Sequence, residues 1–79
     1  MKIRSVKKNN RKHAFEVATW RSQYLFPYVK AEPAPSVSDP VAEVSVDDEL
    51  GREAFTYRLV SGMGGSIHIE QVFEYNQDP

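Results

Sequence analysis

The sequence contains no cysteine and only two histidines among its 79 residues. Without cysteine it has no disulfide framework of the kind that stabilises small secreted domains, which favours a reducing, cytoplasmic compartment. No window approaches the ~18 apolar residues that a membrane-spanning helix needs, so we predict no membrane partner. A chain of this length buries only roughly two thirds of its extended surface on folding, so one core needs nearly all the apolar residues. A deep, enclosed active site is therefore not expected.

Residues that could carry out catalysis are scarce. His13 and His68 are the side chains able to act as bases near neutral pH. Ser66 would share a strand face with His68, but no carboxylate is placed to orient the imidazole, as a catalytic triad requires. The acidic run at residues 47–49 lacks the spacing of a calcium loop. We predict no catalytic residue, no metal site and no cofactor, and keep a small His-dependent hydrolase or metal enzyme as an alternative.

The apolar residues recur mostly with a period of two, which is typical of strands with one face on a core. Strands are expected at residues 3–8, 13–20, 24–29, 42–46, 55–60 and 67–70. The apolar residues of 71–76 fit a helical face as well as a strand face, and continuation of the strand is preferred. Gly51 lies between two clean alternating segments and so predicts a hairpin. The fold class is therefore mainly β: an antiparallel curved sheet or small open barrel of five to six strands, in one domain over residues 1–79.

The expected core takes the apolar members of the alternating segments. These are Phe15, Val17, Leu25, Val44, Val46, Phe55, Tyr57, Leu59, Ile67 and Ile69. Residues 31–40 hold three of the five prolines and are predicted to form a long loop, because proline disfavours helix and central strand. The final Asp78 and Pro79 are favoured at the start of a helix, so we expect residues 1–79 to be the amino-terminal part of a longer protein.

Charge is divided between the two parts of the chain. Residues 1–30 hold eight basic residues and one acidic residue, a charge of +7, whereas residues 31–79 hold two basic and ten acidic residues, a charge of -8. Such asymmetry can mark an arm that binds nucleic acid or an acidic partner. The alternative explanation of the asymmetry is purely structural: basic and acidic strands lie side by side in one sheet. Each cross-strand pair of opposite charges would then contribute about 0.2–1 kcal/mol to stability.

The basic first third also contains interleaved aromatic residues, among them Trp20. Single-stranded nucleic acid is held by this combination of phosphate contacts and stacking rings. The candidate nucleic-acid-binding residues are Lys7, Lys8, Arg11, Lys12 and Arg21. The overall pI of about 6.1 argues against a dedicated nucleic-acid surface, so this function is kept as an alternative.

Residues 24–29 are apolar on both faces of the expected strand. Pro27 cannot donate to a sheet ladder, which places it at an edge or a bulge, and an apolar edge strand favours pairing with another strand. The candidate self-association residues are Tyr24, Phe26 and Tyr28, and a homo-oligomer is the expected partner. The preferred function is therefore a noncatalytic interaction or assembly module.

Residues 52–70 (REAFTYRLVSGMGGSIHIE) and 75–79 (YNQDP) resemble the β-rich front part of small, uncharacterised bacterial proteins that continue into a helix-turn-helix-like domain. The resemblance covers mainly the second half of the chain. It implies a cytoplasmic, transcription-associated bacterial protein whose DNA-reading helices would lie beyond Pro79. No recognition helix is expected within residues 1–79, so the resemblance assigns no base-reading residue here.

Overall fold

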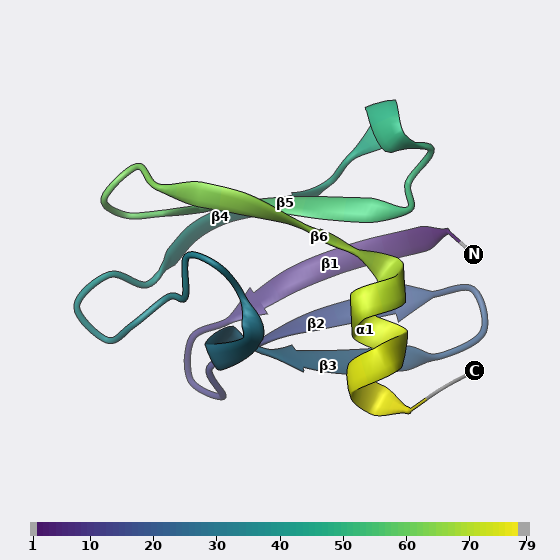
Figure 1. Cartoon of the computed structure of the whole chain (residues 1–79), viewed down its shortest axis with the longest axis horizontal. Helices are drawn as coiled ribbons and strands as arrows, with labels where there is room; N and C mark the ends of the chain where they lie inside the picture. The colour runs from purple at the N-terminus through teal and green to yellow at the C-terminus, as the bar shows by residue number, and fades with distance from the viewer. Residues whose placement is uncertain (1, 78–79) are drawn as a thin grey trace.

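The computed structural model describes residues 2–77, apart from the side chain of Leu50. The described strands form two three-stranded antiparallel sheets (Figure 1). The first sheet contains β1 (Ile3–Asn9), β2 (Ala14–Thr19) and β3 (Gln23–Pro27), and the second contains β4 (Val41–Val46), β5 (Ala54–Leu59) and β6 (Gly64–His68). The helical elements are the 3₁₀ turns η1 (Tyr28–Lys30) and η2 (Asp48–Leu50) and the helix α1 (Ile69–Asn76).

The mainly β, antiparallel character predicted from the sequence is confirmed, with six strands in the described part of the chain. The single curved sheet is not what forms, because the strands divide into two sheets of three. Within residues 2–77 the strands do not close into a barrel. The expected hairpin across Gly51 is confirmed as β4 and β5, and Gly51 has the left-handed backbone that this turn requires, with φ of 66°.

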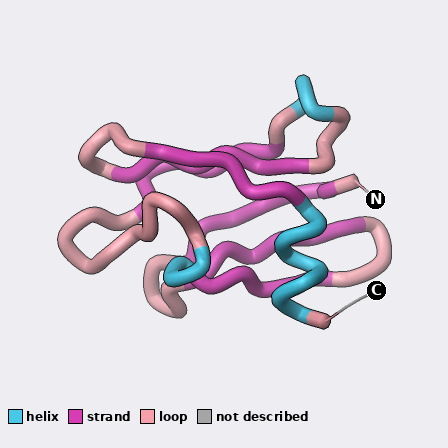
Figure 2. The backbone as a smooth tube through the Cα atoms, in the orientation of Figure 1, coloured by secondary structure: helices cyan, strands magenta, loops and turns pink. Residues whose placement is uncertain are grey.

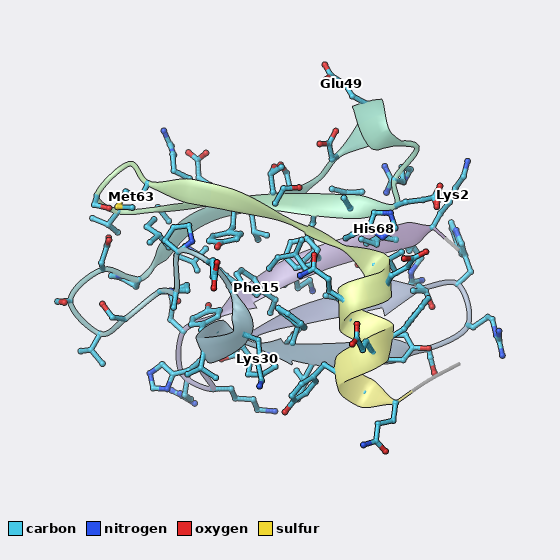
Figure 3. All side chains as sticks on the ribbon, viewed as in Figure 1. Lys2, Phe15, Lys30, Glu49, Met63 and His68 are labelled. Atoms are coloured by element: carbon cyan, nitrogen blue, oxygen red, sulfur yellow. The ribbon has the colours of Figure 1, made fainter. Side chains whose placement is uncertain are left out.

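The core lies between the two sheets, and Phe15 of β2 is at its centre (Figure 3). The Phe15 ring centroid is 5.1 Å from that of Phe55 and 5.2 Å from that of Tyr57, both on β5. It is also 4.8 Å from the ring of Tyr28, in an edge-on arrangement. Aromatic pairs of this kind contribute about 0.5–1.5 kcal/mol beyond the burial of their area. The contacts of Phe15 therefore join the two sheets directly.

Different contacts close the two sides of the sandwich. Along one side β1 lies next to β4, where Lys8 Nζ donates to the carbonyl oxygen of Ala42 at 3.0 Å. Along the other side α1 crosses between β6 and β3 (Figure 2). Asn76 Nδ2 at the end of α1 donates to the carbonyl oxygen of Leu25 on β3 at 3.1 Å. The helix therefore fixes the position of β3 relative to the second sheet.

The strand predicted for residues 71–76 is wrong, because this segment is most of α1. His68 caps the helix: its Nδ1 accepts a hydrogen bond from the backbone N–H of Glu70, and Gln71 Oε1 accepts from the backbone N–H of His68. Ile69 and Val72 are buried on one face of the helix, as a period of 3.6 requires. Burial of that face and the cap together outweigh the strand-like composition of the segment.

The core prediction is also wrong for Leu25, which is 43% exposed. In the register of the first sheet Phe15 pairs with Phe26, and Glu16 pairs with Leu25. Phe26 therefore shares the inner face with Phe15, while Leu25 shares the outer face with Glu16. Val44 and Val46 are only partly buried at the margin of the core.

The predicted loop at residues 31–40 is confirmed, and its first half is packed against the second sheet. Tyr57 Oη donates to the carbonyl oxygen of Pro33 at 2.7 Å. A Cβ atom at Gly65 of β6 would lie 2.7 Å from the carbonyl oxygen of Glu32, so this close approach requires glycine. The helix start expected at residues 78–79 lies outside the described residues.

We predict that alkaline pH destabilises the fold through its buried tyrosines. Desolvation raises the pKa of Tyr57, as does the charge of Glu32; desolvation also raises the pKa of Tyr28, outweighing the lowering by a backbone hydrogen bond from Asn9. Unfolded tyrosine loses its proton near pH ~10, while these folded residues retain theirs. The free energy of unfolding should therefore fall as pH rises above ~10.

Urea unfolding between about pH 8 and pH 11 measures this dependence. Tyr57→Phe should show a shallower loss than the wild-type chain, whereas Tyr75→Phe, which changes an exposed tyrosine, should follow the wild type. Equal slopes for Tyr57→Phe and wild type would contradict the prediction.

We also predict that His68→Ala lowers the free energy of unfolding by about 1 kcal/mol, the usual cost of losing an N-cap. His68→Asn should retain most of the stability, because asparagine is among the best capping residues. Thermal unfolding of the three chains measures the difference. An alanine variant as stable as the asparagine variant would show that the cap is not needed.

Candidate functional site

The outer face of the first sheet is the strongest candidate site. Phe15 and Val17 of β2 belong to the core between the sheets, so by alternation Glu16 and Ala18 lie on the outer face, where neighbouring side chains leave only 6% of Ala18 exposed. The outer face therefore presents two cross-strand rows, Lys7–Glu16–Leu25 and Ser5–Ala18–Gln23. The side chain of Ala18 is small, so the middle of this face is a shallow depression.

An open groove of about 560 Å³ runs over this face. Its lining contains three basic side chains, Arg4, Lys7 and Lys12, and one carboxylate, that of Glu16. Asn76 at the end of α1 also lines it. Three cations against one anion give the groove a net positive charge, although the whole chain carries a formal charge of -1.

Arg4 reaches the groove because of a β-bulge. Ile3 pairs with Thr19 and Ser5 pairs with Ala18, so Arg4 is the extra residue of β1. A bulge bends a strand and redirects a side chain. The bulge is held by Arg52, from the connection between β4 and β5, which donates to the carbonyl oxygen of Ile3 at 3.2 Å through Nε and to that of Arg4 at 2.8 Å through Nη2.

Trp20 lies beside Arg4, with the guanidinium carbon 5.6 Å from the centre of the indole ring. The turn that carries Trp20 is tightly hydrogen-bonded to buried Thr19. Thr19 Oγ1 accepts from the backbone N–H groups of Arg21 and Ser22, and both the Thr19 hydroxyl and its backbone N–H donate to the carbonyl oxygen of Ser22. The indole is thus presented on a defined turn, and 77% of the residue is exposed.

The basic residues of the first 30 positions have no carboxylate partner within 4.0 Å in the described structure. Its two ion pairs, Arg52–Asp48 and Arg58–Glu43, both lie in the second half of the chain. The prediction that basic and acidic strands lie side by side in one sheet is wrong, because β1, β2 and β3 pair only with one another. The positive charge of the first sheet is available to an external anion.

A second hollow of about 470 Å³ lies on β4 and β5 and provides a contrast. Its charged side chains, Arg58 and Glu43, are paired with each other. This hollow presents no excess charge to a ligand.

The predicted nucleic-acid-binding residues are only partly brought together. Lys7 and Lys12 line the groove. Lys8 instead bridges to β4 through its hydrogen bond with Ala42. Arg11 and Arg21 are exposed on the turns at opposite ends of β2, outside the groove lining. Sequence reasoning did not select Arg4, because a strict period of two carries no sign of the bulge that turns it toward the groove.

The predicted self-association residues belong mainly to the interior of the chain. Phe26 is 3% exposed and Tyr28 is 2% exposed. Tyr24 is partly buried, with its ring 5.3 Å from that of Phe73 on α1. The apolar character of this segment therefore serves the core and the helix contact, and two of the three side chains are not on the surface that pairing would use.

The histidines have separate surroundings. His68 Nδ1 is engaged in the helix cap, and exposed His13 lies on the β1–β2 turn with its ring 6.4 Å from that of Tyr28. Across residues 2–77 no three histidine or carboxylate side chains gather in a way that would hold a metal ion. The described helices include none with the length and apolar character needed to cross a bilayer.

Comparison of the chain with protein-family models, with curated proteins and with solved structures found no match. The function of the chain is therefore inferred from the groove and its surroundings. The resemblance to bacterial helix-turn-helix-like proteins stays a prediction from the sequence.

We predict that Arg52→Met destabilises the fold by about 1–2 kcal/mol, because the substitution removes charge-assisted hydrogen bonds to the carbonyl groups of the bulge. Arg58→Met is the matched control: it breaks an exposed ion pair of the same residue type, which is expected to cost at most about 1 kcal/mol. Chemical denaturation of both variants measures the difference. Equal losses would mean that Arg52 does not support the bulge.

Proposed function

We propose that this chain is a noncatalytic binding module that holds an anionic polymer in the groove on the outer face of β1–β3. The observation that carries the proposal is the cluster of Arg4, Lys7 and Lys12 around one hollow, with no carboxylate in ion-pair contact with any of the three in the described structure. The proposal retains the interaction class predicted from the sequence but moves the contact surface from residues 24–29 to the groove.

The groove suits a charged ligand that binds reversibly. Its cations are exposed, so they keep most of their hydration and each contributes modestly and in a salt-dependent way. Glu16 lies among them, where its Oε2 accepts a hydrogen bond from Asn9 Nδ2 at 2.8 Å and Lys7 is its cross-strand neighbour. This carboxylate opposes an anionic ligand and so limits affinity.

The open shape of the groove also favours a polymer over a small molecule. Pockets for small ligands bury most of the ligand surface, whereas this face is a shallow sheet surface with cations distributed along it. A bacterial cytoplasmic setting, expected from the sequence, would supply nucleic acid and polyphosphate as ligands of this type.

We expect Lys7→Gln/Lys12→Gln to weaken binding of inorganic polyphosphate by about 2- to 30-fold, from about 0.2–1 kcal/mol per exposed contact. Arg11→Gln/Lys30→Gln removes the same charge outside the groove and should have a smaller effect. Glu16→Gln should strengthen binding. Titration calorimetry at low and moderate salt measures all four chains.

Two results would overturn the proposal. One is the absence of polyphosphate binding at low salt. The other is an equal loss in the two double variants, because binding would then follow total charge and would not depend on the groove.

A further inference from the structure

We infer that the polymer held in this groove is single-stranded nucleic acid and that Trp20 stacks on one of its bases. The inference rests on the proposed function, since it names the class of polymer that the same site takes. It goes further because it assigns a role to an exposed aromatic residue that does not line the groove itself.

Trp20 has the surroundings of a stacking platform. It is the only tryptophan in the sequence, and 77% of it is exposed, whereas Phe15 and Phe55 are fully buried. Its turn is fixed by four hydrogen bonds from Thr19 to Arg21 and Ser22, so the backbone that carries the ring is ordered before a ligand arrives. An ordered backbone at this turn loses little conformational freedom on binding, which favours affinity.

Arg4 connects the platform to the groove. Its side chain lines the groove, and its guanidinium carbon is 5.6 Å from the indole centre. Because most of Trp20 remains exposed, the guanidinium covers only a minor part of the ring. A base can therefore lie on the indole while a neighbouring phosphate is contacted by Arg4, the combination by which single strands are bound.

The dimensions agree with a short stretch of polymer. β2 has six residues, which at about 3.3 Å per residue span about 20 Å. Lys12 lies just before this strand and Trp20 just after it, so cations and ring are spread along its length. Single-strand sites on small β domains take about 4–16 nucleotides, and this groove belongs at the short end of that range.

Duplex DNA fits this site less well. Bases in a duplex are stacked on one another, so a ring on a sheet face cannot reach them without their extrusion. In the described part of the chain, the helix of eight or more residues is α1. Its charged side chains are Glu70 and Glu74, which would repel the phosphates on either side of a duplex groove. An acidic peptide could meet the cations, but its carboxylates would gain nothing from the indole comparable to base stacking.

The test uses the intrinsic fluorescence of Trp20, which reports on this one site because the sequence has a single tryptophan. The probes are single-stranded DNA and RNA of about 16 nucleotides, a DNA duplex of the same length, inorganic polyphosphate and polyglutamate. We expect both single strands, or one of them, to quench Trp20 and to bind more tightly than the duplex. The relative affinities of the two single strands show whether DNA or RNA is the preferred ligand.

The variants separate stacking from charge. Trp20→Ala should weaken binding of a labelled single strand by about 5- to 150-fold, measured by anisotropy, and should weaken polyphosphate binding less than single-strand binding. Trp20→Phe should restore part of the loss, because phenylalanine also stacks. Circular dichroism checks that both variants are folded. If Trp20→Ala does not fold, Trp20→Phe still tests the inference, because it keeps an aromatic ring at this position.

Failure of this inference differs from failure of the proposed function. If polyphosphate binds through Lys7 and Lys12 but single strands cause no quenching and are insensitive to Trp20→Ala, the groove binds anions and the assignment to nucleic acid is overturned. Tighter binding of duplex DNA, or quenching by polyglutamate equal to that by single strands, would overturn it as well. If no probe binds in the groove, the proposed function itself is overturned.

Discussion

The position of Phe15 is the constraint on which the rest of the structure depends. Its side chain is completely buried and contacts Phe55 and Tyr57 of the opposite sheet, so it sets both the contact between the sheets and the orientation of β2. Side chains alternate along a strand, so once Phe15 and Val17 face inward, Glu16 and Ala18 must face outward. A slip of one residue would exchange these faces, burying Glu16 and exposing Phe15. The groove is therefore a geometric consequence of the core.

The second half of the chain supports the site without supplying its charge. Arg52 crosses from the turn after β4 to the carbonyl groups of the bulge in β1, and that bulge directs Arg4 to the groove. The same turn carries the acidic cluster of η2, which extends away from the body of the molecule (Figure 3). The formal charge of -1 is a sum over two sheets of opposite character and conceals a local positive face. For this reason the overall pI is a poor guide to what the first sheet can bind.

The sequence predicted those parts of the fold that depend on local pattern. The hairpin of β4 and β5 follows from alternation and from Gly51, and the loop at residues 31–40 follows from its prolines. The sequence did not predict α1, because the decisive cap is His68, which is outside the usual capping set, and the helix has only eight residues. The core predicted from the sequence included Leu25 and not Phe26, because a segment that is apolar on both faces does not show which face is buried. For the site, the basic and aromatic residue types were recognised, but the bulge at Arg4 and the register that brings Lys7 and Lys12 together arise from tertiary contacts.

The residues of the groove are arranged at some expense to the stability of the fold. Arg4, Lys7 and Lys12 gather on one face without ion-pair partners in the described structure, and Trp20 exposes apolar area that burial would stabilise at about 25 cal/mol per Å². Buried side-chain polar atoms in the described part all have hydrogen-bond partners, and the second half of the chain holds two ion pairs, one between β4 and β5 and one at the η2 turn. Departures from local optimisation tend to coincide with functional positions, because selection for binding there opposes selection for stability. Cations without ion-pair partners in the described structure, an exposed indole and a shallow sheet face therefore lie together at one place, and this combination supports the proposed anionic ligand.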